Sequence, residues 1–221
     1  NFQSNLFSLP SAVSIVDSKV INQQDKINIA PILNSIPGIY MHNGTITTNR
    51  ITIRGIGSRN LFGTAKIRAY YEDISLTDGS GLSTIEDIDL NTLGSIEVLK
   101  GPSSSVYGSG LGGTIQLIPD KGLFTTNYIS TTYSVGSFGL HKYLFQSDIG
   151  NSNNNAKITY SNLQREGYRK NNDTKRQSIS VASNHFINNS NKLTFVGAFT
   201  DLKAYIPSSI NIDDYFNDPT S

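Results

Sequence analysis

Hydrophobic and polar residues alternate along the second half of the chain. Five runs of about ten residues place apolar or aromatic side chains at every second position, which is the period of a β-strand. In the first run, Ile129, Tyr133 and Val135 share one face, while serine and threonine occupy the other. The pattern predicts strands over residues 128–135, 140–149, 156–165, 175–187 and 192–202. Such two-sided strands fit either a soluble sandwich or the wall of a membrane β-barrel.

The connections between these runs favour the barrel. Asn151–Asn155 and Asn188–Asn191 are short and almost free of charge, whereas Glu166–Thr174 and the tail from Lys203 onward are longer and more charged. Short turns on one side and long loops on the other are typical of outer-membrane barrels. The short connection Gly136–Gly139 departs from this rule, so the sandwich stays open as the alternative.

The first half of the chain has a different pattern. A strand is predicted over residues 11–17 and one helix over residues 18–35, which Pro37 and Gly38 end. Short strands separated by glycine-rich turns follow at residues 50–54, 67–71, 95–100 and 114–119. We therefore expect a compact α+β segment with long loops, followed near residue 124 by the second unit.

Composition narrows the possible functions. The 221 residues carry 18 lysines and arginines against 17 acidic residues, so a net charge of +1 gives no argument for nucleic acid as a partner. The absence of cysteine excludes disulfides and thiolate metal ligands. No apolar run reaches the roughly 18 residues that a membrane-spanning helix needs.

The candidate catalytic motifs have simpler explanations. Gly108–Gly113 matches the dinucleotide pattern G-x-G-x-x-G, but a predicted strand follows it where the pyrophosphate would need the start of a helix. A tight turn with close strand approach explains these glycines better. The acidic groups around Glu86 and Asp213 lack the spacing of a calcium loop, and the three histidines are too dispersed for a catalytic triad. We therefore expect no enzyme.

The segments taken together resemble the plug domain of TonB-dependent outer-membrane receptors, followed by the first strands of their barrel. The matching blocks occur in the family's order, namely Leu9–Asp17, Ile36–Tyr40, Ile51–Gly55, Leu93–Pro102 and Ser105–Ile118. The resemblance implies a plug domain over residues 1–124 and the N-terminal part of a transmembrane β-barrel over residues 125–221. A weaker similarity links Ile206–Pro219 to an extracellular loop of ferric-citrate-type receptors.

The same resemblance implies a 22-stranded barrel around the plug. Twenty-two strands of about ten residues need far more chain than the 97 residues after the plug, so we expect a fragment with about five barrel strands. A TonB box is not recognisable in Asn1–Pro10, and we expect that it lay upstream. The expected fold class is thus an α+β plug domain followed by antiparallel strands of a truncated transmembrane barrel.

The resemblance further implies an importer in the outer membrane of a Gram-negative cell, driven by TonB with ExbB and ExbD. Lys100-Gly-Pro102 is similar to the siderophore-receptor form of the motif, which favours an iron chelate as the transported substrate. Membrane lipid is an expected partner, and no permanently bound cofactor is expected. Cobalamin, haem or an oligosaccharide as substrate, or a soluble β-rich binding module, are the alternatives.

Two groups of site residues follow from the resemblance. Arg54 and Lys100 fall on plug positions that resemble a latch to glutamates of the barrel. Substrate contacts are expected from loops at residues 42–48, 58–63 and 77–81, where Arg59 would meet an anionic chelate and Phe62 would add contact area. A solvated Arg59 and a Phe62 packed on the barrel wall are the alternative. The expected substrate-binding residues are His42, Asn43, Arg59, Asn60, Phe62, Asp78 and Ser80.

Overall fold

The computed structural model describes residues 12–44, 49–59, 64–102 and 107–221. The chain divides into two compact units, residues 1–120 and 121–221, so the division lies a few residues before the predicted boundary at 124. Each unit is described by itself. Within the described ranges, no helix is long and apolar enough to cross a membrane.

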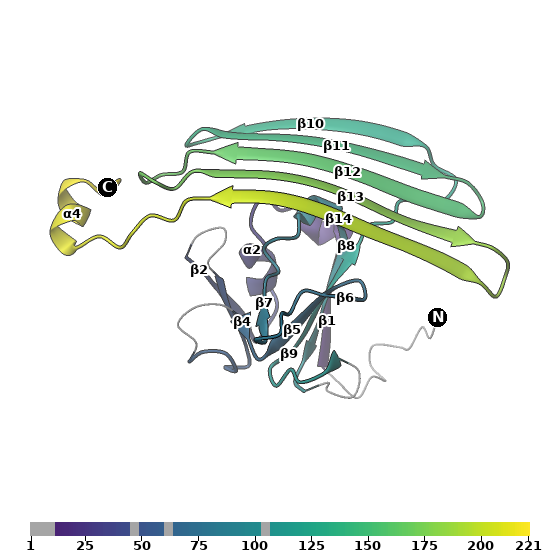
Figure 1. Cartoon of the computed structure of the whole chain (residues 1–221), viewed down its shortest axis with the longest axis horizontal. Helices are drawn as coiled ribbons and strands as arrows, with labels where there is room; N and C mark the ends of the chain where they lie inside the picture. The colour runs from purple at the N-terminus through teal and green to yellow at the C-terminus, as the bar shows by residue number, and fades with distance from the viewer. Residues whose placement is uncertain (1–11, 45–48, 60–63, 103–106) are drawn as a thin grey trace. The chain divides into compact units, whose positions relative to one another are not determined.

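The N-terminal unit is built on a five-stranded sheet with the order β1-β8-β9-β5-β6 (Figure 1). β8 pairs antiparallel with both β1 and β9, whereas β5 and β9 run parallel. Alternate residues of β8 and β9 are fully buried and form the core of the unit, among them Ile96, Val98, Ile115 and Leu117. The strands of this sheet are β1 (Ala12–Asp17), β8 (Leu93–Lys100), β9 (Gly113–Pro119), β5 (Ile67–Tyr71) and β6 (Ile74–Ser75).

The single helix predicted over residues 18–35 is wrong. The structure has two short helices, α1 (Ser18–Asn22) and α2 (Ala30–Asn34), separated by a turn in which Lys26 is left-handed at φ +55°. In that turn the side chains of Asp25 and Asn28 accept hydrogen bonds from backbone N–H groups two residues ahead, at 2.9 Å each. Such local bonds compete with helical ones, and Pro31 supplies no N–H, so the helix stops and starts again.

The β2–β3 hairpin and a second two-stranded sheet complete the N-terminal unit. β2 (Ile39–Asn43) pairs with β3 (Asn49–Ile53), and β4 (Thr64–Ala65) pairs with β7 (Leu82–Ser83). β2 was not predicted, because Pro37 and Gly38 before it suggested only a helix stop. The Asn34 side chain at the end of α2 accepts from the Met41 N–H at 2.6 Å and donates to the Met41 carbonyl at 3.1 Å. This pair of bonds fixes the hairpin on the helix.

The C-terminal unit is an antiparallel sheet in which the strands follow one another in sequence order (Figure 1). The strands are β10 (Tyr128–Gly136), β11 (Leu140–Gly150), β12 (Asn154–Arg165), β13 (Thr174–Phe186) and β14 (Lys192–Ala204), and the short helix α4 (Ile212–Asn217) follows. The five predicted strands are confirmed to within two residues at each end. Alternation located them well because each strand has one apolar and one polar face.

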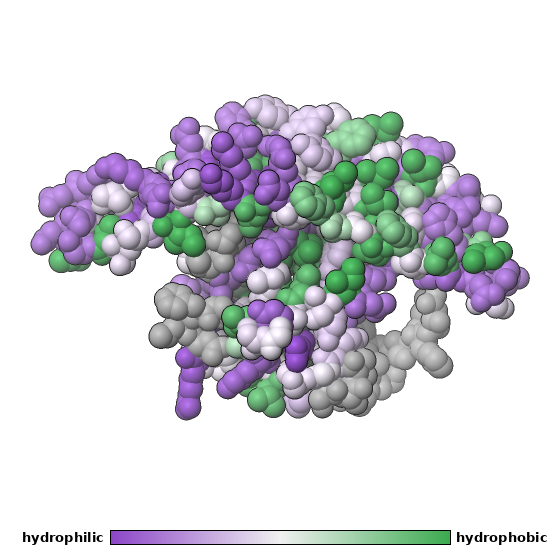
Figure 2. Space-filling view, viewed as in Figure 1, coloured by the Kyte–Doolittle hydropathy of each residue, from purple (hydrophilic) through white to green (hydrophobic). Residues whose placement is uncertain are grey.

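The two faces of this sheet have inverted exposure. On the apolar face, seven side chains are 45–69% exposed: Ile129, Tyr133, Val135, Ile149, Ile179, Phe195 and Phe199. Figure 2 shows hydrophobic residues, in green, along this part of the chain. On the polar face, eight side chains of β11, β12 and β13 are buried and at most 6% exposed: Lys142, Asp148, Asn155, Thr159, Ser161, Arg176, Ser178 and Ser180. A sheet in water would bury the first set and expose the second.

A carboxyl group with an unusual pKa lies in the loop between β7 and the short 3₁₀ helix η2 (Leu90–Thr92). Burial raises the pKa of Glu86 to about 7, and a side-chain hydrogen bond with Asn49 at the start of β3 opposes this shift only in part. The Glu86 Oε2 atom is buried without a hydrogen-bond partner among the described residues. Protonation removes the charge that this site solvates poorly.

The raised pKa of Glu86 predicts that acid stabilises the N-terminal unit. The folded form holds a proton that the unfolded chain releases above about pH 4.5, so the free energy of unfolding falls as the pH rises from about 4.5 to about 7. The loss is up to about 3 kcal/mol, and Glu86→Gln flattens this part of the pH profile. Urea unfolding at a series of pH values measures it. The exposed carboxyl of Asp73 gives the control Asp73→Asn, and an equally flat profile there would contradict the assignment.

Candidate functional site

Two basic residues that are 46 positions apart in the sequence meet at one turn of the N-terminal unit. Arg54 follows β3, and its Nη1 atom donates to the carbonyl of Lys100 at 3.4 Å. Lys100 ends β8, and its ammonium group donates to the carbonyl of Pro37 at 2.8 Å. The Arg54 N–H donates to the Gly38 carbonyl at 2.8 Å. The turn at Pro37 and Gly38 therefore holds both cations, which we call the cation pair.

Among the residues that the structure describes, no acidic side chain pairs with Arg54 or Lys100, whereas Lys157 pairs with Asp148 and Lys170 with Asp218. Desolvation, together with the neighbouring charge of Arg54, lowers the pKa of Lys100. Arg54 also has a left-handed backbone at φ +51°, a conformation that costs free energy for a residue with a Cβ. The turn thus holds two positive charges close together in a strained loop.

Glycines allow the chain before β9 to approach β8 and β5 closely. Gly113 at the start of β9 has φ +140°, and a Cβ atom there would overlap the carbonyl oxygen of Leu99. A Cβ atom on Gly110 would crowd the side chain of Arg68, and a Cβ atom on Gly112 would crowd the side chain of Ile67. The close strand approach that the sequence predicted for the Gly108–Gly113 motif is confirmed.

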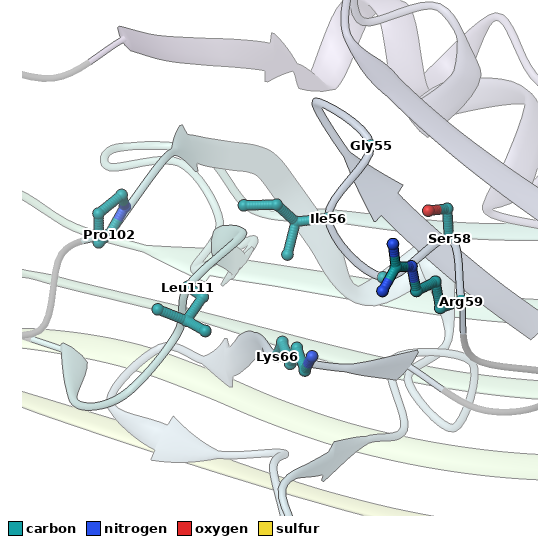
Figure 3. A pocket seen from close by; sticks show the side chains of 8 residues that line it. Gly55, Ile56, Ser58, Arg59, Lys66, Pro102 and Leu111 are labelled. Atoms are coloured by element: carbon teal, nitrogen blue, oxygen red, sulfur yellow. The ribbon is translucent and has the colours of Figure 1, made fainter.

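A pocket of about 520 Å³ lies beside the cation pair and is lined by loop residues of the N-terminal unit. The wall is formed by Gly55, Ile56, Gly57, Ser58, Arg59, Lys66, Pro102 and Leu111. In Figure 3, Arg59 lies across the pocket from Pro102 and Leu111, with Ile56 between them. Two basic side chains on an apolar lining suit a ligand with both anionic and apolar groups.

Lys66 was not among the predicted site residues. It precedes β5 with a left-handed backbone at φ +64°, and its carbonyl accepts from the Gly112 N–H at 2.9 Å. A basic residue directly before a buried strand was the available signal. Its place opposite a glycine loop more than 40 residues away could come only from the tertiary structure.

The other predicted substrate-binding residues fall into separate places. His42 and Asn43 are exposed on β2, where they pair with Arg50 and Asn49 of β3. Asp78 and Ser80 form one turn, in which the Asp78 carboxylate accepts from the Ser80 N–H, the Ser80 hydroxyl and the Leu82 N–H at 2.6–3.0 Å. Two further predicted residues, Asn60 and Phe62, lie outside the described residues.

The Asp78 turn is already satisfied by its own bonds. The side-chain hydrogen bond from Ser80, followed by the backbone bond from Leu82, holds the pKa of Asp78 below its ordinary value. No hydrogen bond or ion pair in the described ranges joins His42, Arg59 and Asp78. Of the predicted substrate-binding residues that the structure describes, Arg59 lines the pocket.

Two of the acidic residues, Asp89 and Asp218, have local partners. Asp89 accepts from the Asn91 N–H at 2.8 Å and caps η2, and Asp218 pairs with Lys170 at 2.8 Å. The described residues contain no group of three or more histidine or acidic side chains that could hold a metal ion.

Comparisons with known proteins agree with the family expected from the sequence. Residues 5–114 match the family model described as TonB-dependent Receptor Plug Domain. The iron-regulated outer membrane virulence protein of Vibrio cholerae is 30% identical over 115 residues, which are 51% of this chain and 18% of that protein. The chain thus spans about a fifth of the length of the curated relatives it matches.

Solved structures extend the likeness to both units. The pyoverdine outer membrane receptor FpvA of Pseudomonas aeruginosa has a TM-score of 0.73 at 18% identity, covering 88% of this chain and 28% of that one. The ferric yersiniabactin uptake receptor FyuA of Yersinia pestis has a TM-score of 0.71 at 18% identity, covering 86% and 31%.

These identities show the fold alone, and they confirm the expected class of a plug followed by antiparallel strands of receptor type. The proteins named are receptors and transporters rather than enzymes. Together with the family model, they identify residues 5–114 as the plug domain of a TonB-dependent receptor.

Proposed function

We propose that this chain is part of an outer-membrane receptor that imports an iron complex, a ferric siderophore or ferric citrate, into a Gram-negative cell. The observation that carries the proposal is a TonB-dependent plug domain followed directly by strands with an exposed apolar face. The iron-regulated relative and the ferric yersiniabactin uptake receptor support iron as the cargo. In this proposal residues 1–120 are the plug, and residues 121–221 belong to the barrel wall.

The exposed face of the C-terminal sheet suits contact with lipid. Its side chains are aromatic or branched aliphatic, and the strands of 9–13 residues are long enough to cross the hydrocarbon core at a tilt. Moving such a face from water into lipid is favourable for every apolar side chain that leaves the water. This face therefore supports an outer-membrane location.

A charge introduced on the exposed face tests the lipid contact. Phe199, in the middle of β14, is 67% exposed, and Ala198 beside it is on the other face. Phe199→Arg should destabilise the full-length receptor folded in lipid vesicles by about 2–4 kcal/mol. The reason is that arginine is poorly solvated near the bilayer midplane. The control Ala198→Arg should cost less. Equal costs in a vesicle-refolding titration would contradict the lipid-facing assignment.

Energy coupling follows from where the receptor works. The outer membrane keeps no proton gradient, while a site with nanomolar affinity holds its ligand by about 12 kcal/mol. Release into the cell therefore needs work from elsewhere, which we assign to TonB acting on the plug with ExbB and ExbD at the inner membrane. The plug family match supports this assignment.

The cation pair suits a latch between the plug and the wall. Arg54 and Lys100 sit together without a described counter-ion, so carboxylates from another part of the receptor would relieve their repulsion. Arg54 offers a bidentate fork, whereas Lys100 offers a single point charge. Breaking such an enclosed pair costs more than breaking a solvated one.

The latch predicts a change in plug mobility. Arg54→Ala in the full-length receptor should speed hydrogen exchange of β3 and β8 and alter the transport rate, because one side of the latch is lost. Arg54→Lys should restore part of the protection. The exposed Lys19 of α1 provides the control Lys19→Ala. If Arg54→Ala leaves both exchange and transport unchanged, the latch assignment is wrong.

The pocket beside the cation pair is the proposed place of substrate contact. Arg59 and Lys66 would bind the anionic groups of the chelate, and Ile56 and Leu111 would contact its apolar parts. His42, Asn43, Asp78 and Ser80 remain proposed contacts from the neighbouring loops.

Uptake of radioactive iron tests the function directly. Cells whose only receptor is the full-length protein should accumulate iron from a ferric chelate, and collapse of the proton-motive force should stop accumulation without abolishing binding. Arg59→Ala should weaken chelate binding about tenfold or more, because a charge-assisted bond is lost. Arg169, whose guanidinium is engaged by the Ser221 carbonyl, lies outside the pocket and gives the control Arg169→Lys. Accumulation that continues without the proton-motive force would contradict the proposal.

A further inference from the structure

The first seven residues of the C-terminal unit, Lys121–Asn127, are bound along the sheet that follows them, and we call this segment the strap. The Asn155 amide of β12 donates to two successive carbonyls of the strap, Lys121 at 2.9 Å and Gly122 at 2.8 Å. At the other end, the Asn127 side chain accepts from the Gly150 N–H at 3.1 Å. The strap is thus bonded at both ends.

The middle of the strap is held by packing. The ring of Phe124 lies against the ring of Phe186 at the end of β13, with centroids 5.7 Å apart. This tilted arrangement is favourable for aromatic pairs. The strap therefore contacts β11, β12 and β13, although its own backbone is in no strand.

Two glycines shape the seat of the strap. Gly122 has φ +79°, and a Cβ atom there would lie 2.7 Å from the Asp148 Oδ1 atom and 3.0 Å from the Ala156 carbonyl oxygen. A Cβ on Gly150 would overlap the carbonyl of Leu123. Both positions require glycine for the strap to lie this close to the β11–β12 hairpin.

The seat is also buried. Asn155 is 2% exposed, and in the same sheet Asp148 pairs with Lys157 at 3.3 Å, with side chains 6% and 11% exposed. An amide buried to this degree keeps its hydrogen bonds, because leaving either carbonyl unpaired would cost about 1–3 kcal/mol.

The preceding residue is held by the other unit. The Asp120 N–H donates to the Thr92 carbonyl at 2.8 Å. Pro119 before it ends β9 opposite Leu93, where proline has no N–H to give to the ladder. Adjacent residues, Asp120 and Lys121, are therefore attached to different units.

We propose that the strap stays with the sheet when the plug moves, and that Asn155 is the positioning residue that sets the pivot at the Asp120–Lys121 link. This inference rests on the proposed function, in which the plug is pulled. Under load the residues up to Asp120 leave their sheet first. The strap keeps its two carbonyls on Asn155, so only the residues before Lys121 are free to move.

Single-molecule pulling tests the strap directly. The full-length receptor is held in a lipid bilayer and pulled from its N-terminus. After the plug unfolds, the strap should release as a separate event of about 24 Å, the extended length of seven residues at about 3.4 Å each. Asn155→Ala should abolish or strongly weaken this event. Asn162→Ala, the same change on the same strand but away from the strap, should leave it intact.

A second variant guards against misfolding as an explanation. Gly122→Ala keeps the Asn155 amide but fills the space against Asp148, so it should lower the release force of the strap while the later events of the sheet stay unchanged. Release of the strap together with the plug in the unmodified receptor would overturn the inference, as would a strap event that survives Asn155→Ala. The proposed importer function would stand in either case, because iron uptake is measured separately.

Discussion

The inverted exposure of the C-terminal sheet is the constraint on which the rest of the structure depends. Its apolar side chains are open, while lysine, arginine, asparagine and serine are covered on the opposite face. Water would favour the reverse arrangement, so the open face requires an apolar surrounding. In the proposed function, a membrane supplies that surrounding.

The N-terminal unit holds charged side chains and a strained backbone conformation close together. Glycines let β8 and β9 approach closely, and the turn at Pro37 and Gly38 holds Arg54 beside Lys100. The buried Glu86 and the left-handed Arg54 add further cost. Groups that are costly in one state and relieved in another are suited to a domain that must move.

The strap begins at the link between the two units. One residue is bonded to the plug sheet and the next to the sheet of β10–β14, so a pull on the plug is concentrated on a single link. A buried asparagine and two glycines hold the strap on the sheet without any charged group.

Local pattern was sufficient for the C-terminal strands, because alternation survives wherever one face is apolar and the other polar. The family could also be recognised from ordered blocks such as Leu93–Pro102, whose glycine and proline positions are tied to particular turns. Local pattern failed over residues 18–35, where the side chains of Asp25 and Asn28 bond to nearby backbone and interrupt the apolar periodicity.

What the sequence by itself determined is therefore the class of the chain and the place of its strands, since both depend on short-range periodicity. Only the tertiary structure brought Arg54 to Lys100, Lys66 to the pocket of Arg59, and Asn155 to the strap. These contacts join residues 7 to 46 positions apart through loops whose course depends on glycine conformations and on sheet order. No local sequence pattern predicts these contacts, because each residue alone resembles an ordinary polar residue near the end of a strand.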